Sequence, residues 1–317
     1  MATVRRAVID VGTNSVKLLV ADVTGHDVLP VHEESRQTRL GKGFYETHRL
    51  QPEPIARTAE AVWEFAEIAR DRNADSIRVI ATSAARDAIN PTDLTISIER
   101  ACGLKTEIIT GAREADWAFQ GVATDPGLAK HPLLLLDVGG GSTEFILGQG
   151  EHKHFRESFP LGTVRLMEKV PHSDPPKPEE LAGCRQWLKM FLATEVQPKV
   201  VPRMNCEQKI FSARTGLQLV GTGGTASILA RMELQATDFN RERIEATRLS
   251  RERVSWHVQH LWSLALADRE KIVGLPAKRA DVILTGAAIY EAVIEQFGFA
   301  ELRVSTRGLR FAAVMED

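Results

Sequence analysis

One pattern occurs twice in this chain and constrains its fold more than any other feature: an apolar strand that ends in Asp, followed at once by a glycine turn. The first copy reads Val8-Ile9-Asp10-Val11-Gly12, and the second reads Leu135-Leu136-Asp137-Val138-Gly139. The second strand opens with four leucines, 133–136, which are too few to span a membrane and fit a strand buried on both faces. Each Asp therefore stands where a buried strand ends.

The turn after Asp137 is unusually rich in glycine and hydroxyl groups, in the order Gly139, Gly140, Gly141, Ser142 and Thr143. Glycines can take positive φ and let another molecule approach the backbone, and successive backbone amides favour a bound anion. This combination favours a phosphate site. A plain hairpin turn is the alternative, because residues 144–147 read as a returning strand. In the first copy, Asn14 and Ser15 occupy the corresponding place.

The resemblance between the two copies continues downstream. A helix is predicted over 54–72 and a strand over 77–81 in the first half, and a helix over 178–196 and a strand over 217–220 in the second. The second strand runs into Gly223, Gly224 and Thr225, whose amides would open a helix and could bind phosphate. A repeat of this length in 317 residues predicts two similar α/β domains that face one another, with a cleft between the two Asp-Gly turns.

Charge limits the partners that such a cleft could hold. The net charge is −2, so a polyanion would have to be bound by a local basic patch rather than by the field of the whole protein. Arg36, Arg39 and Lys42 form one such group, which fits either a solvated charged edge or a contact for an anionic substrate. The charged run 241–253 mixes both signs, which argues against nucleic-acid binding.

Three further residues have both a structural and a functional interpretation. Arg86 follows the predicted helix start at Ser83, where it is either a surface charge or part of an anion site made with helix amides. Glu114 lies in the first turn of a predicted helix, where it either favours the helix dipole or accepts a proton from water. Arg165, shortly after Gly162, is a further candidate phosphate contact.

The remaining features concern location and boundaries. Cys102, Cys184 and Cys206 are odd in number and lack metal-ligand spacing, which predicts reduced thiols in a cytoplasmic protein. No signal peptide or membrane span is expected, and hence no membrane partner. Asp125-Pro126-Gly127 is a turn sequence that predicts a domain boundary.

Seven motifs, taken together and in order, resemble the exopolyphosphatase and guanosine pentaphosphate phosphatase family. They begin at Asp10, Arg86, Gly111, Asp137, Gly221, Arg279 and Ser305 and cover essentially the whole chain. The resemblance implies two duplicated actin-like (ribonuclease H-like) α/β domains that face one another across a cleft. It places residues 1–125 plus 304–317 in the first domain and 126–303 in the second, as in the short, two-domain members.

The reaction implied by the resemblance is hydrolysis of a terminal phosphoanhydride of inorganic polyphosphate, with release of orthophosphate. Glu114 matches the catalytic glutamate, and Arg86 acts beside it on the phosphate. Asp137 and Glu144 match the carboxylates around a divalent ion, Mg²⁺ or Mn²⁺. The residues implied to hold phosphate are Asp10, Asn14, Ser15, Gly139, Gly140, Gly141, Ser142, Thr143, Gly223, Gly224 and Thr225.

Other functions fit the same motifs and stay open at this stage. Guanosine pentaphosphate could replace polyphosphate as the substrate, in a stringent-response role. A non-catalytic sensor of either compound and a phosphotransferase of the same superfamily are further alternatives. The motifs are also compatible with a homodimer, and with an ion held by the protein or carried in by the substrate.

Overall fold

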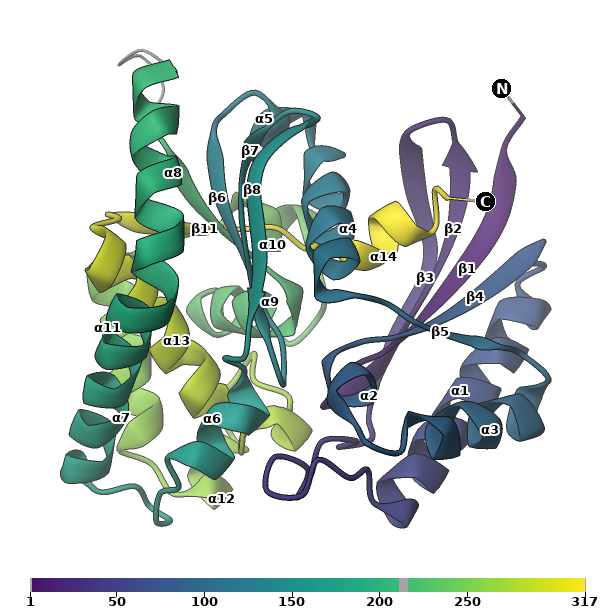
Figure 1. The fold of residues 1–317 in the computed structure, drawn as a ribbon, viewed down its shortest axis with the longest axis horizontal. Helices are drawn as coiled ribbons and strands as arrows, with labels where there is room; N and C mark the ends of the chain where they lie inside the picture. Colours follow the sequence, from purple (N-terminus) through teal and green to yellow (C-terminus); the bar gives the residue numbers. More distant parts are fainter. Residues whose placement is uncertain (1, 211–215, 317) are drawn as a thin grey trace. The chain divides into compact units, whose positions relative to one another are not determined.

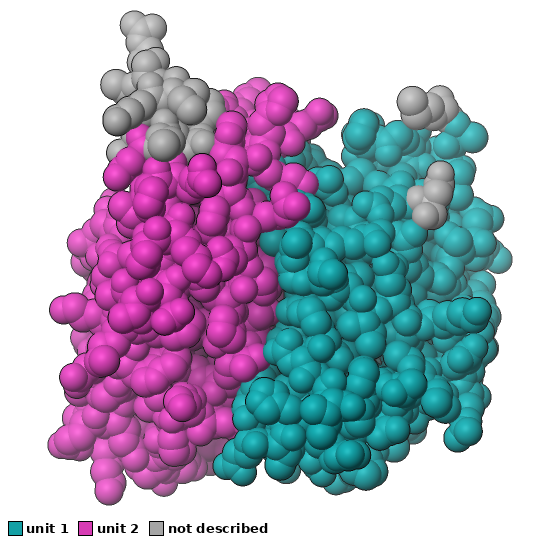
Figure 2. Space-filling model, viewed as in Figure 1, with its two compact units in different colours: residues 1–124, 307–317 teal, residues 125–306 magenta. Residues whose placement is uncertain are grey.

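The computed structural model describes residues 2–210 and 216–316 of the chain. The fold divides into two compact units (Figure 2). Unit 1 comprises residues 1–124 and 307–317, and unit 2 comprises residues 125–306. Each unit contains a mixed β-sheet with helices, so the expected α/β class is confirmed.

Unit 1 has a five-stranded sheet in the order β3-β2-β1-β4-β5 (Figure 1). Strands β1, β2 and β3 form an antiparallel meander, and β4 and β5 continue the sheet parallel to β1. The strand bounds are β1 Val4–Val11, β2 Ser15–Thr24, β3 Asp27–Gln37, β4 Ser76–Ala81 and β5 Thr106–Ile108.

Helices cover both faces of this sheet because β1 alternates buried residues between them. Ala7 and Ile9 pack with α1 and α3, whereas Val8 packs with α4 and α14. A side chain on Gly121 of α4 would collide with the Gly308 carbonyl, at 2.1 Å, so a glycine lets the C-terminal segment cross α4 closely. The helix bounds are α1 Pro52–Asp71, α2 Ser83–Asp87, α3 Pro91–Cys102, α4 Gly111–Ala123 and α14 Leu309–Ala313.

Unit 2 has a six-stranded sheet in the order β10-β11-β9-β6-β7-β8. Read from β8, the order β8-β7-β6-β9 matches β3-β2-β1-β4 of unit 1, with the same antiparallel meander and the same parallel partner. The repeat inferred from the sequence is therefore a repeat of topology. The strand bounds are β6 Leu133–Val138, β7 Thr143–Gln149, β8 His152–Phe159, β9 Gln218–Thr222, β10 Arg248–Ser250 and β11 Glu301–Val304.

The helices of unit 2 share one hydrophobic core with alternate residues of β6, such as Leu134 and Leu136. Helix α13 supplies most of its length to that core, including Leu284 and Tyr290. The bounds are α5 Pro126–Ala129, α6 Thr163–Lys169, α7 Pro178–Phe191, α8 Gln197–Ile210, α9 Gly223–Glu233, α10 Arg241–Ala246, α11 Arg251–Trp262, α12 Leu266–Arg269 and α13 Ile283–Phe297.

Three local predictions from the sequence are wrong or incomplete. The helix expected to end at Val196 continues through a π-helical turn, Leu192–Val196, into α8, where tertiary packing overrides the prolines at 198 and 202. The charged run 241–253 reads in the sequence as a loop followed by a solvated helix face, but its start forms helix α10. Helix α3 was not foreseen, although Pro91 at its start and Gly103 at its left-handed end are the usual signals.

Two further expectations concerned the cysteines and membrane-spanning helices. Cys102 and Cys184 are free thiols, and burial raises the pKa of Cys184 to about 12. The side chain of Cys206 lies outside the described residues. Among the described parts of the chain, no helix has the length and apolar character that crossing a membrane requires.

Candidate active site

The Asp10 turn of unit 1 joins β1 to β2. The backbone amide of Gly12 donates to the Ser15 carbonyl at 3.0 Å, which closes the turn. The carboxylate of Asp10 is buried, and Lys17 lies directly opposite on β2, with its Nζ 4.0 Å from Oδ2. Burial raises the pKa of Asp10, while Lys17 and Arg310 act to lower it.

Several buried polar atoms around this turn have no hydrogen-bond partner among the described residues. They are Asp10 Oδ1, Thr13 Oγ1 and Asn14 Nδ2, together with Ser83 Oγ at the start of α2. The two segments are neighbours, because the Thr82 amide donates to the Val11 carbonyl at 3.1 Å. Buried polar groups are normally satisfied, so this concentration of donors and acceptors favours a polar ligand.

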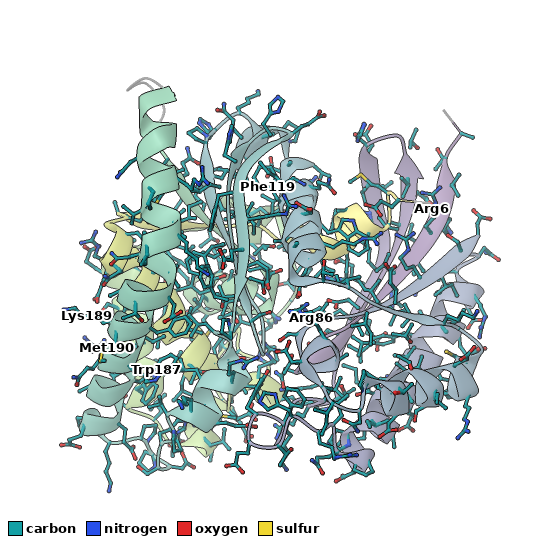
Figure 3. The ribbon with its side chains drawn as sticks, in the orientation of Figure 1. Arg6, Arg86, Phe119, Trp187, Lys189 and Met190 are labelled. Carbon is teal, nitrogen blue, oxygen red and sulfur yellow. The ribbon has the colours of Figure 1, made fainter. Side chains whose placement is uncertain are left out.

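Arg86 and Glu114 come from different helices of unit 1 and form an ion pair. Arg86, labelled in Figure 3, lies on α2, and its Nη1 is 2.8 Å from Oε2 of Glu114 on α4. The same Nη1 donates to the Ile109 carbonyl at 3.2 Å. Glu114 is only 7% exposed. The carboxylate is therefore fixed in a rigid first turn by a guanidinium, which a role in the helix dipole alone would not require.

In unit 2 the Asp137 turn reproduces the Asp10 turn. The Gly139 amide donates to the Ser142 carbonyl at 3.0 Å, as Gly12 does to Ser15. Glu144 lies directly opposite Asp137 on β7, so the two carboxylates share one face of the sheet. Glu144 is buried and accepts a hydrogen bond from Ser158 Oγ at 2.7 Å. The position that holds Lys17 in unit 1 thus holds a carboxylate in unit 2.

The carbonyls of the glycine-rich turn are bound by α6. The Thr163 amide donates to the Gly139 carbonyl at 2.9 Å, and the Val164 amide donates to the Gly140 carbonyl at 2.8 Å. A side chain on Gly162 would meet the backbone of Gly140 at 2.5 Å, so this close packing requires glycine. The amide of Gly139 is used inside the turn, so an anion at this turn would have to be bound by the amides that follow it.

A second glycine turn, at the start of α9, lies against Asp137. Gly223 has φ +82°, and a side chain there would stand 2.4 Å from Asp137 Oδ1. Thr225 Oγ1 donates to the Val138 carbonyl at 3.3 Å, so this hydroxyl ties α9 to β6. The first amides of α9 lack partners within their own helix and provide donors for an anion beside Asp137.

Comparison with known proteins identifies the family of this chain. The model of the Ppx/GppA phosphatase family matches residues 19–316. This chain belongs to the Ppx/GppA phosphatase family. It is similar to exopolyphosphatase 2 of Mycobacterium tuberculosis H37Rv, at 37% identity over 96% of each chain, and to exopolyphosphatase 1 of Mycobacterium bovis, at 28% identity over 98% of this chain and 87% of the relative.

Solved structures agree with this assignment. An exopolyphosphatase from Cytophaga hutchinsonii has a TM-score of 0.83 at 26% identity and covers 97% of this chain and 96% of its own. A PPX-GPPA enzyme from Aquifex aeolicus has a TM-score of 0.77 at 28% identity, with full coverage of both chains. The actin-like fold expected from the motifs is thereby confirmed, and membership of a phosphatase family makes the chain an enzyme.

Local sequence patterns indicate no role for two cations of this Ppx/GppA member, Lys17 and Arg279. Alignment of the two copies singles out Lys17, because it lies opposite Asp10 in unit 1 as Glu144 lies opposite Asp137 in unit 2. Arg279 precedes α13, and its Nη2 lies 3.3 Å from the point where a side chain of Gly224 would begin. Its Nε is buried without a partner among the described residues, and burial lowers the pKa of the guanidinium. Arg279 is therefore a candidate phosphate contact at the α9 turn.

Helix α13 packs closely against the segments that follow Asp137 and Thr222 in this family member. A side chain on Gly286 would collide with the methyl groups of Thr225 and Thr163, at 2.6 and 2.9 Å. Tyr290, one helical turn further, is fully buried with its hydroxyl 3.4 Å from the Leu136 carbonyl and 3.3 Å from the Thr222 carbonyl. Burial and the neighbouring Asp137 raise the pKa of Tyr290. The phenol thus bridges β6 and β9 beneath Asp137.

Arg36 and Arg165, two further candidate cations, bind other groups of the protein. Arg36 pairs with Glu64 of α1 and lies 3.6 Å from Glu34, which fits the charged-edge interpretation. Arg165 donates through Nε to the Gly141 carbonyl at 2.7 Å, so it supports the glycine turn. Arg39 belongs to a segment that binds the Asp10 turn, since its amide donates to the Asn14 carbonyl at 3.0 Å.

Proposed function

We propose that this chain is an exopolyphosphatase, which hydrolyses the terminal phosphoanhydride of inorganic polyphosphate and releases orthophosphate. The observation that carries the proposal is the buried Glu114 carboxylate fixed by Arg86 in unit 1. The relatives named exopolyphosphatase support the choice of substrate.

In phosphoryl transfer the protein contributes mainly by positioning the reactants and by neutralising the charge of the phosphate oxygens. The oxygen of water bonds to the terminal phosphorus as the bridging P–O bond breaks. The departing polymer keeps the bridging oxygen together with the electron pair of the broken bond. Glu114 orients the water and accepts its proton. Arg86 fixes the Glu114 carboxylate and places a positive charge beside the phosphoryl oxygens.

The glycine turns of unit 2 bind phosphate in this proposal. The amides of Gly140, Gly141 and Ser142 follow the amide that closes the turn, and the first amides of α9 begin at Gly223. Both sets belong to backbone that approaches Asp137 or its strand closely because no side chain intervenes. Arg279 adds a guanidinium at the α9 turn.

We further propose that Mg²⁺ or Mn²⁺ serves the reaction and is held by Asp137 and Glu144. Within the described residues, no group of three His, Cys, Asp or Glu side chains could hold a metal. A pair of carboxylates fits Mg²⁺, which usually keeps several waters and takes one or two carboxylates plus substrate phosphates. When bound, the ion neutralises the charge of the phosphate oxygens.

The decisive experiment measures phosphate release from four substrates side by side: long-chain polyphosphate, tripolyphosphate, guanosine pentaphosphate and ATP. Each is tested with Mg²⁺ and with excess chelator. We expect the highest kcat/KM with long-chain polyphosphate, and no phosphate release from any substrate in excess chelator. A higher kcat/KM for guanosine pentaphosphate would identify that compound as the preferred substrate. Full turnover in chelator would refute the requirement for a metal ion.

A matched pair of variants links the activity to the site. Glu114→Gln should abolish most turnover. Glu67→Gln is the control, because Glu67 also pairs with an arginine, Arg70, but on the exposed surface of α1. Equal activity of the two variants would contradict the assignment of Glu114.

A further inference from the structure

Lys17 lies beside the Asp10 turn of unit 1 and has no assigned part in the proposed hydrolysis. It belongs to β2, where it pairs with Asp10 of β1 on one side and with Ser35 of β3 on the other. The side chain of Lys17 is 27% exposed, against 4% for the side chain of Asp10. A ligand can therefore reach Lys17 more readily than it can reach the carboxylate.

Strand register places Lys17 on the face of the sheet that carries helix α4. Side chains alternate between the two faces along a strand, so Lys17 lies on the same face as Leu19. Leu19 belongs to one hydrophobic cluster with Trp117 of α4. The first turn of α4 contains Glu114. Lys17 and Glu114 thus belong to the same side of the sheet.

The same side chains also share one edge of the sheet. Strands β1, β4 and β5 run parallel and end at this edge, where the Thr82 amide donates to the Val11 carbonyl at 3.1 Å. Helices α2 and α4, which carry Arg86 and Glu114, begin there. Lys17 is therefore a further cation at the edge of unit 1 that holds the proposed base.

One interpretation is that Lys17 serves only as the counter-ion of Asp10, but that pairing is incomplete. Lys17 Nζ lies 4.0 Å from Asp10 Oδ2, beyond hydrogen-bond distance, and Asp10 Oδ1 has no hydrogen-bond partner among the described residues. Burial keeps the pKa of Asp10 raised although Lys17 and Arg310 act to lower it. Asp10 therefore does not use the three N–H donors of the ammonium group.

Other donors accompany Lys17 at this turn. Asn14 Nδ2, Thr13 Oγ1 and Ser83 Oγ are buried and lack hydrogen-bond partners within the described parts of the chain. Amide and hydroxyl groups can donate to phosphate oxygens, whereas an ionised carboxylate only accepts and repels an anion. A phosphate at this turn therefore needs a cation to offset Asp10, and Lys17 supplies one.

The two copies of the repeat differ at this pair of positions. In unit 2 the carboxylates of Asp137 and Glu144 lie opposite one another, so that pair needs a cation from outside the chain. In unit 1 the cation is the side chain of Lys17, opposite Asp10. The duplicated turns thus offer an anion two different sources of positive charge.

We propose that Lys17 binds a phosphate group of the polyphosphate chain in unit 1, with its ammonium group between a phosphate oxygen and Asp10. An ammonium group is a compact charge with three donors on a flexible stem, so Asp10 can hold one side of it while phosphate binds another. This inference rests on the proposed function for the identity of the chain, and it adds a substrate contact.

The test is calorimetric titration with an analogue of tripolyphosphate in which methylene groups replace the bridging oxygens, so that binding is measured without hydrolysis. Lys17→Gln should weaken binding by about 10- to 100-fold, because a hydrogen bond between charged groups is lost. Lys17→Arg keeps the charge and should bind within about 5-fold of the parent.

Lys105→Gln is the matched control, because Lys105 is an exposed lysine that precedes β5, at the opposite end of the parallel strands from Asp10. It removes the same charge from unit 1 and should change the dissociation constant by less than about 2-fold, since exposed charges are screened by salt. Equal dissociation constants for Lys17→Gln and Lys105→Gln, or no binding by the parent protein, would overturn the proposal.

A double-mutant cycle separates a phosphate contact from a counter-ion role. In the Asp10→Asn protein no carboxylate remains for Lys17 to neutralise, so adding Lys17→Gln should still weaken binding by about 10-fold or more. Loss of the effect in this background would mean that Lys17 acts only on Asp10. The double variant also contains no unpaired buried carboxylate, so it serves if Lys17→Gln alone folds poorly.

Turnover is measured separately on polyphosphate. If the parent protein releases no orthophosphate, the proposed function is wrong, whereas the dissociation constants still decide whether Lys17 binds phosphate. If the parent protein does release orthophosphate but Lys17→Gln binds the analogue as tightly as the control variant, the role of Lys17 alone is refuted.

Discussion

Replacement of Glu114 by Gln is the sharpest test of the reaction, and the structure sets its expected size. Gln preserves the shape of the side chain and one acceptor oxygen, but it cannot take a proton from water. If Glu114 is the general base, kcat should fall by about 10²- to 10⁴-fold while substrate affinity changes little.

The same substitution should also lower stability, because Glu114 is buried and paired with Arg86 at 2.8 Å. A hydrogen bond to a charged group contributes about 1.5 to 3 kcal/mol. Part of this is retained, since Gln can still accept from Arg86, and Arg86 keeps the Ile109 carbonyl. We therefore expect a loss of about 1 to 2 kcal/mol, which lowers the thermal midpoint by roughly 2 to 8 °C.

The assay measures kcat on long-chain polyphosphate and the thermal midpoint for the parent, Glu114→Gln, Arg86→Gln and the double variant. The stability losses of the two single variants should add up to more than the loss of the double variant, because either change alone breaks the same pair. The activity loss should be far larger than the stability loss explains at a temperature where every variant is folded. A lowered midpoint with kcat within a factor of a few of the parent would leave Glu114 with a structural role only.

Four further outcomes are expected. Glu144→Gln should raise the Mg²⁺ concentration for half-maximal activity by at least 10-fold, and an unchanged requirement would remove Glu144 from the metal site. Tyr290→Phe should raise the same concentration about 3- to 10-fold with little change in kcat at saturating Mg²⁺, since Asp137 loses the bridge beneath it; a matching fall in kcat at saturating Mg²⁺ would argue against a positioning role. Arg86→Ala should weaken polyphosphate binding, measured as KM at two salt concentrations, more than Arg36→Ala, because Arg86 lies beside the proposed base Glu114 whereas Arg36 pairs with Glu64 of α1; the reverse ranking would relocate the anion site. Burial lowers the pKa of His257, so the folded state favours the neutral ring, and the free energy of unfolding should decrease as the pH falls below about 6.5; His257→Asn should flatten that slope in thermal melts, and an equal slope in both proteins would contradict this account.

The sequence by itself determined the features that depend on neighbouring residues. Two buried strands that end in Asp10 and Asp137, and the glycine turns that follow them, are encoded within a few residues each. The same turn geometry then appears in both units, with Gly12 bonded to Ser15 and Gly139 bonded to Ser142 at the same distance. Local patterns of this kind fix strand ends and turns because they depend on backbone conformation and hydrophobic alternation.

Only the tertiary structure decided which distant side chains meet. Arg86 and Glu114 are far apart in sequence and lie on separate helices, so no local pattern could show that a guanidinium fixes the carboxylate. The place of Arg279 beside Gly224, and of Tyr290 beneath Asp137, likewise depends on how α13 packs against β6 and β9. Such contacts follow from the close packing of the whole core, which the order of residues along one segment does not specify.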